Sequence, residues 1–195
     1  PHGFAMKPSH AKMLQNADLI FWVGEDLESF LEKPLESIAK KAEKIELMGI
    51  KGLNVLKFRE RNIFDEHDDH DHDGHAKKKK DGHDDHDDHD GHDDHEGHAH
   101  GEYDPHIWLD PINAKVILKE MTEHLIENDS KNASTYKSNL DKALKDIDKL
   151  TMDVMTELNQ SVASIVFHDA YQYFEERFNV NILGAFTVNT DVMPG

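Results

Sequence analysis

Histidine is the residue type in this sequence best able to do chemistry, because its side chain can ligate a transition metal or carry a proton near neutral pH. The chain has 16 histidines and no cysteine among its 195 residues. A tight transition-metal site would therefore have to use imidazole and carboxylate ligands rather than thiolates. This composition favours zinc, copper, nickel or manganese as the bound cation.

Most of the histidines are concentrated in one run of the type His-Asp-Asp-His, with glycines interspersed. Dense imidazoles and carboxylates in a flexible chain offer many interchangeable ligand sets, so we expect several weak and poorly selective metal sites here. The alternative interpretation is a solvated acidic linker whose histidines are incidental. The eleven histidines of the run are His67, His70, His72, His75, His83, His86, His89, His92, His95, His98 and His100.

The negative charge of the chain is concentrated in the same region. Residues 65–104 hold 17 acidic residues against four lysines, which accounts for 13 of the net 18 negative charges. Such a charge argues against nucleic acid and anionic membrane surfaces as partners, and it favours cations. Because the segment has no apolar periodicity, residues 65–103 are predicted to form a disordered loop.

The other five histidines are scattered. His10 and His124 lie within amphipathic helical patterns beside charged residues and are expected to be surface histidines. His2 stands just before a predicted helix, His106 precedes an apolar run, and His168 ends a predicted buried strand. Ligands of open α/β sheets bind at the carboxyl ends of strands, which is where His168 should lie. Taken singly, each of these three also fits a structural role.

The apolar pattern predicts the elements that position these residues. Strands and helices alternate along the chain, which indicates an α/β domain with a parallel sheet. Before the histidine-rich run the pattern gives a helix from Pro8 to about Asn16, a buried strand over 19–23, a helix over about 27–42 with a break at Pro34, and a short strand over 44–47.

Beyond the run, Asp110 and Pro111 fit the N-cap and first position of a helix that continues to about Glu127. A second helix of about 25 residues, about 37 Å long, starts near Ala133 and could bridge two lobes. A strand over 164–167, a helix over 171–178 and a strand over 182–188 follow. Asp110 and Asp169 could each orient an imidazole or cap a helix, and capping is favoured for Asp110.

Three local sequences are informative when taken together. They are Pro1-His2-Gly3 leading into Lys7-Pro8-Ser9 and Gln15-Asn16-Ala17-Asp18-Leu19-Ile20; His106-Ile107-Trp108-Leu109-Asp110-Pro111; and Phe167-His168-Asp169-Ala170-Tyr171-Gln172-Tyr173-Phe174. In combination they resemble the cluster A-I solute-binding proteins of metal ABC transporters. They occur in the order and at the distances of that family, and the histidine-rich run has the expected place ahead of His106.

The resemblance implies a two-lobed α/β protein in which helices flank parallel sheets and a long rigid helix joins the lobes. On this basis we expect an N-terminal lobe over 1–130, the interlobe helix over 131–160 and the start of a C-terminal lobe over 161–195. The chain looks like a fragment that lacks the family's first strand and most of its C-terminal lobe.

The family's first three zinc ligands correspond to His2, His106 and His168. Manganese-binding relatives usually have glutamate at the third of these positions, and three imidazoles suit zinc better than manganese. The fourth ligand, an aspartate, is expected beyond Gly195. Because the neutral imidazole is the ligand, acidification through about pH 6.5 should weaken capture.

The expected function is high-affinity capture of Zn²⁺ and its delivery to a membrane permease, with the histidine-rich run as an accessory collector or sensor. The protein is expected to be monomeric, and to be either periplasmic or lipid-anchored outside the cell. A zinc hydrolase is a second hypothesis, although no His-Glu-x-x-His motif is present. A metal buffer or adhesin that uses the histidine-rich run alone is a third.

Overall fold

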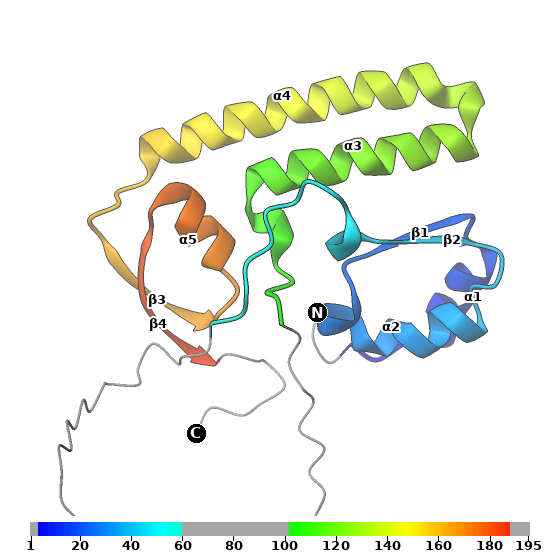
Figure 1. The fold of residues 1–195 in the computed structure, drawn as a ribbon, viewed down its shortest axis with the longest axis horizontal. Helices are drawn as coiled ribbons and strands as arrows, with labels where there is room; N and C mark the ends of the chain where they lie inside the picture. Colours follow the sequence, from blue (N-terminus) through cyan, green and yellow to red (C-terminus); the bar gives the residue numbers. More distant parts are fainter. Residues whose placement is uncertain (1–3, 60–101, 188–195) are drawn as a thin grey trace, which may run out of the picture.

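The computed structural model describes residues 4–59 and 102–187 (Figure 1). The predicted loop over 65–103, apart from its last two residues, therefore lies outside the described residues, as does His2. The helices are α1 (Pro8–Asn16), α2 (Glu25–Ser37), α3 (Pro111–Asn128), α4 (Ala133–Glu157) and α5 (Gln172–Phe178), with 3-10 turns η1 (Leu47–Gly49), η2 (Ile107–Leu109) and η3 (Ser130–Asn132). The strands are β1 (Leu19–Trp22), β2 (Glu43–Glu46), β3 (Ala163–His168) and β4 (Asn181–Thr187).

The first sheet pairs β1 with β2 in parallel, as the apolar run predicts. On one face Ile20 packs with Leu35, Ala39 and Ala42 in a buried cluster contributed by α2 and the residues after it. Contacts of α3 with β1 cover the other side, where Phe21 meets the ring of His124 edge-on. The α/β class is confirmed, and the strand is enclosed by helices because its side chains are apolar on both faces.

The predicted break at Pro34 is wrong. α2 runs through Pro34 to Ser37, and its one non-helical residue is Glu28 instead. The Glu28 carboxylate accepts a hydrogen bond from the backbone N–H of Val23 at 2.6 Å, which draws the first turn back toward β1. At Pro34 the helix loses one hydrogen bond, but it keeps Leu35 in the core, and the burial outweighs that loss.

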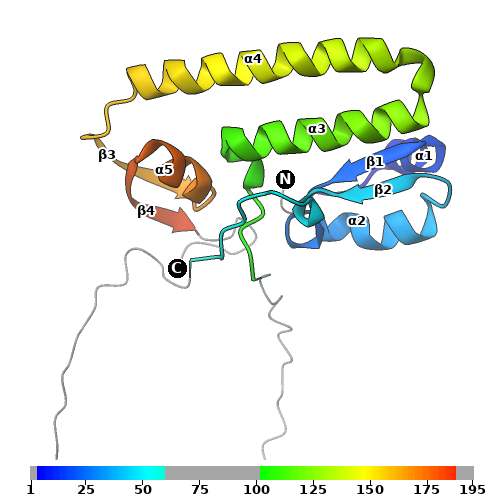
Figure 2. The same cartoon turned by 45° about the horizontal axis from the view of Figure 1, so that its top comes forward.

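Two antiparallel helices form one side of the molecule, with α4 lying along α3 (Figures 1 and 2). Both predicted starts are confirmed, at Pro111 and Ala133. Leu150, Met152 and Met155 on the second half of α4 remain exposed. No helix within the described ranges is long and apolar enough to cross a membrane.

The second sheet pairs β3 with β4 in parallel, and α5 connects the two strands. Their carboxyl ends lie side by side, because His168 at the end of β3 pairs with Thr187 at the end of β4. The predicted strand, helix and strand of this region are therefore confirmed to within about two residues. His168 lies at the sheet edge where ligands of open α/β sheets bind.

A short antiparallel stem joins the chain on either side of residues 60–101. The stem consists of Leu56–Phe58 and Glu102–Asp104, with Lys57 and Tyr103 paired as a β-bridge. Backbone hydrogen bonds of 2.9 and 3.1 Å flank this bridge. The stem ends only two residues before His106, so the stem itself lies next to a predicted metal ligand.

Candidate metal centre

His106 is held in a buried loop immediately before η2. Its residue is only 5% exposed, and Ile107 beside it is fully buried. Ile107 packs with Ile50, Ile117 and Tyr173 in a second apolar cluster. The apolar residue that follows His106 therefore anchors the loop, and the imidazole has a defined position.

Asp104 orients the His106 ring. One carboxylate oxygen, Oδ1, lies 2.6 Å from Nδ1 of His106 and accepts the backbone N–H of His106 at 3.0 Å. A neutral imidazole that donates through Nδ1–H has Nε2 as its acceptor nitrogen, which is the form that a metal ion requires. Sequence reasoning missed Asp104, although a carboxylate two residues before a candidate ligand could have been noticed.

His168 meets His106 at the end of β3. The two ring centroids lie 5.2 Å apart and the rings are inclined by 67°. Burial, and then the neighbouring His106, lower the pKa of His168 below its ordinary value. Both effects disfavour the imidazolium. The neutral ligand form of His168 therefore persists to lower pH than an unperturbed histidine would allow.

The carboxylate of Asp169, the residue after His168, lies near the guanidinium of Arg59. Its Oδ2 lies 3.7 Å from Nε of Arg59, which also pairs with Glu175 of α5. The backbone N–H of Asp169 donates to Thr187 at 3.0 Å, which fixes the chain where it leaves β3. Asp169 thus pairs with Arg59, whereas Asp104 is the carboxylate that contacts the His106 imidazole.

Asp110 has the predicted capping role and a second role that the sequence did not indicate. Its Oδ1 accepts the backbone N–H of Ile112 at 2.8 Å, which caps α3. The same carboxylate receives two hydrogen bonds from Arg177 of α5, at 2.8 and 2.7 Å. This pairing with a carboxylate raises the pKa of Arg177. Asp110 therefore ties the segment after His106 to the helix that follows His168.

Tyr173 of α5 contacts the segment that precedes His106. Its hydroxyl donates to the backbone carbonyl of Asp104 at 2.7 Å and accepts the backbone N–H of Leu56 at 3.0 Å. The residue is 1% exposed, and this burial raises its pKa to about 12.

The buried hydroxyl of Tyr173 leads to a prediction at alkaline pH. Because its pKa is higher in the folded protein than its ordinary value of about 10, its contribution to stability is complete below pH 10 and is lost as the pH rises through about 12. A shift of this size corresponds to about 2–3 kcal/mol. Tyrosinate absorbance should show a late ionisation that is missing in Tyr173→Phe; identical titration curves would contradict this assignment.

The two histidines expected at the surface have local partners. His10 of α1 accepts the backbone N–H of Lys7 at 3.2 Å and so helps to cap its own helix. His124 of α3 contacts Glu43 at 2.8 Å and Glu120 at 3.5 Å, and its side chain is partly buried. Around them lie the rings of Phe4 for His10 and of Phe21 for His124. Neither histidine belongs to the pair formed by His106 and His168.

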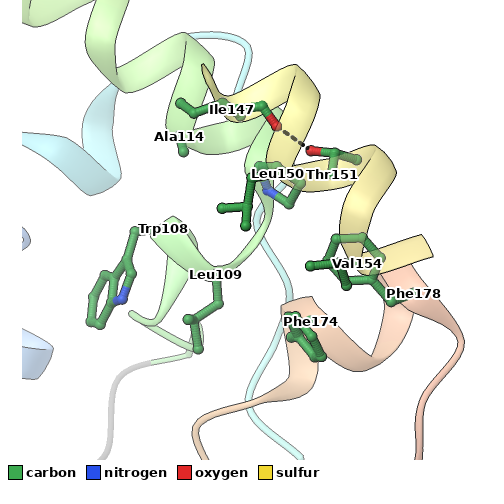
Figure 3. Close-up of a pocket in the computed structure, with 10 residues that line it drawn as sticks. Trp108, Leu109, Ala114, Ile147, Leu150, Thr151, Val154, Phe174 and Phe178 are labelled. Carbon is green, nitrogen blue, oxygen red and sulfur yellow. Dashed lines mark hydrogen bonds between the residues drawn. The ribbon is translucent and has the colours of Figure 1, made fainter. Parts of the chain in front are cut away.

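An apolar groove of about 200 Å³ lies beside the centre, between η2, α4 and α5. Figure 3 shows Trp108, Leu150, Val154 and Phe174 around it. The lining offers no imidazole or carboxylate, so the groove is not a metal site. Its wall at Trp108 lies close to the centre, since the Trp108 and His106 rings are 5.5 Å apart.

The described residues bring together two of the three predicted zinc ligands. His2 and the eleven histidines of the run lie outside them. Within residues 4–59 and 102–187, no group of three or more histidine or acidic side chains is arranged to hold a metal ion. The described part of the centre is thus His106, oriented by Asp104, next to His168, and it requires at least one further ligand to complete a metal site.

The family model for the zinc-uptake complex component A, periplasmic, matches residues 1–195. The chain belongs to the ZnuA family. This finding confirms the family resemblance of the three histidine-containing segments. ZnuA relatives are described as proteins of high-affinity zinc uptake systems.

Similar ZnuA proteins include that of Brucella abortus (strain 2308), which is 45% identical over 199 residues, with 100% of this chain and 60% of that protein covered. The ZnuA of Paracoccus denitrificans (strain Pd 1222) is 47% identical over 182 residues, covering 92% and 54%. That of Yersinia pestis is 35% identical over 197 residues, covering 100% and 58%. The chain therefore spans less than two thirds of the length of these relatives.

Solved structures show the same fold. A crystal structure of ZnuA matches with a TM-score of 0.68 and 21% identity, covering 100% of this chain and 60% of that chain. The Zn(II)-bound AdcAII E280Q variant of Streptococcus pneumoniae matches with a TM-score of 0.64 and 22% identity, again covering 100% and 60%. At these identities the likeness supports the ZnuA fold alone.

Proposed function

We propose that this chain captures Zn²⁺ between its two sheets for import into the cell. The observation that carries the proposal is the meeting of His106 and His168, which come from distant parts of the sequence and have ring centroids 5.2 Å apart. Asp104 keeps His106 in the tautomer that can bind a metal. Burial favours the neutral form of His168. An imidazole oriented by Asp104, next to a second imidazole, is the beginning of a tetrahedral zinc site.

His2 is the proposed third ligand, and the family's aspartate, expected beyond Gly195, is the proposed fourth. A site dominated by imidazole favours zinc over manganese, which prefers more oxygen ligands. The names of the relatives, which refer to zinc uptake, agree with this preference. Competition titrations should therefore show tighter binding of Zn²⁺ than of Mn²⁺.

The proposed partner is the membrane permease of an ABC-type zinc importer, to which the chain delivers the ion as a monomer. The matching family is described as periplasmic, and we propose the same location for this protein. We further propose one lobe over 1–130, a connecting helix over 131–160 and a second lobe from 161. The function is binding without chemistry, so zinc should cause no hydrolytic turnover that depends on His168.

The histidine-rich run is the proposed accessory collector or sensor of zinc. Its acidic residues attract cations mainly at low salt. Because the sequence of the run predicts a disordered loop, each ion bound there is expected to order the chain around it, whereas His106 and His168 are positioned by the fold. The run should therefore bind several ions more weakly than the centre.

Deleting residues 65–101 tests which part of the chain holds zinc tightly. The deletion keeps the stem, and calorimetric titration should show that the weak sites disappear while one tight site remains. A matched variant of full length, in which the eleven histidines of the run are replaced by glutamine, should behave in the same way. Loss of all zinc binding in both variants would favour a metal buffer over a capture protein.

A further inference from the structure

We propose that α5 is a bracket that sets the position of His106 relative to His168, with Tyr173 and Arg177 as its two positioning residues. The inference rests on the proposed zinc capture and concerns the state before zinc arrives. Through the bracket, the two imidazoles stand together in the zinc-free protein. Zinc then binds a site in which these two ligands are already next to each other.

The first arm of the bracket is Tyr173, in the first turn of α5. Its hydroxyl donates to the carbonyl of Asp104, the residue whose carboxylate orients His106. It also accepts the N–H of Leu56, on the opposite side of the stem. One buried hydroxyl thus fixes both strands of the stem just before His106.

The second arm is Arg177, four residues later and therefore on the same side of the helix. Its guanidinium makes a bidentate pair with Asp110, which is 2% exposed and caps α3. Bidentate pairing fixes orientation as well as distance. The arms therefore hold the chain at 104 and at 110, on both sides of His106.

The other end of the bracket is attached to His168 through the chain itself. α5 begins four residues after His168, and the intervening turn is closed by a 2.9 Å hydrogen bond from the N–H of Ala170 to the carbonyl of His168. Arg59 of the segment beside the stem adds an ion pair with Glu175 of α5. Movement of α5 would therefore change the separation of the two imidazoles.

Such preorganisation matters because a ligand that is ordered only when zinc binds reduces the observed affinity by the cost of ordering it. Losing one arm should leave both imidazoles chemically intact but less well placed. Replacement of groups that orient metal ligands typically lowers metal affinity by about 10- to 100-fold. We expect a loss of about tenfold for each arm.

The test compares two arm variants of the full chain with matched controls. Tyr173→Phe keeps the ring and removes the hydroxyl, and Arg177→Gln removes the bidentate pair. Tyr136→Phe is the control for the first, because its hydroxyl bonds Asp129 at 3.0 Å on the far part of the helix pair. Lys115→Gln is the control for the second, because it breaks only an ion pair with Asp148 on α3 and α4.

Two measurements are made on each protein below its unfolding transition. The first is zinc affinity by competition with a chelator. The second is the nuclear Overhauser effect between the His106 and His168 rings without zinc. The arm variants should lose about tenfold in affinity and most of the ring-to-ring signal, which saturating zinc should restore. The controls should keep both, and Arg177→Lys should recover part of the loss.

The bracket is wrong if both arm variants retain the affinity and the ring-to-ring signal of the unmodified chain, even if they melt at lower temperature. If Tyr173→Phe does not fold, the zinc affinity and the ring-to-ring signal of Arg177→Gln and Arg177→Lys test the bracket. A different result would contradict the proposed zinc capture: the unmodified chain would have no tight zinc site that is lost when His106 is replaced. The ring-to-ring signal in the zinc-free variants would still test the bracket, so the two failures can be told apart.

Discussion

Replacing His106 with alanine is expected to lower the affinity of the tight zinc site by about 100-fold or more. Structural zinc sites provide about 10–16 kcal/mol from four ligands, or about 3 kcal/mol for each ligand. His106 is also the imidazole that the fold orients most firmly, through Asp104. Titration calorimetry with a competing chelator measures the change.

His124→Ala is the matched control for His106→Ala. His124 is also a partly buried histidine next to carboxylates, but its partners are Glu43 and Glu120. Its replacement should leave the tight site unchanged. If His106→Ala keeps that site while circular dichroism shows a native fold, the assignment of the metal centre is wrong.

Replacing Asp110 with alanine is expected to have the largest effect on stability, a loss of about 4 kcal/mol in the free energy of unfolding. The substitution removes the cap of α3, worth about 1 kcal/mol, and it also removes the buried carboxylate that pairs with Arg177, so the guanidinium loses this partner. Breaking a buried ion pair by removing one partner typically costs about 3–5 kcal/mol. Arg177 is 28% exposed and can be partly solvated, so the lower end applies.

Urea denaturation followed by circular dichroism tests this value against Asp148→Ala. Asp148 also pairs with a cation, Lys115, at 2.6 Å, but both side chains are more exposed to solvent. Exposed pairs contribute about 0–1 kcal/mol. Equal losses in the two variants would show that the pair of Asp110 with Arg177 adds nothing beyond an ordinary surface contact.

The sequence predicted most elements because the signals for them are local. A proline at the first turn marks α1 and α3, and an aspartate before Pro111 marks the cap. The apolar run that ends at His168 placed this residue correctly at the carboxyl end of a strand. Pro34 misled the prediction, because its local preference was outweighed by burial of the α2 face in the core.

The contacts that build the centre could not be predicted in the same way. Tyr173 and Arg177 reach partners 69 and 67 residues away in the sequence. On a sequence pattern, a tyrosine in an amphipathic helix is an ordinary core residue and an arginine there is an ordinary surface residue. Only the packing of α5 against the segment 104–110 gives them a role at the centre, and that packing is a property of the whole fold.

The stem of Leu56–Phe58 and Glu102–Asp104 also makes this position of the chain tolerant of changes in length. Since the two ends are already joined by the bridge of Lys57 with Tyr103, inserted residues do not have to bring them together. The entropy of closing a loop grows slowly, and each doubling of its length costs only about 0.6 kcal/mol. The segment between the two strands of the stem can therefore be lengthened, shortened or replaced without rebuilding the centre two residues away.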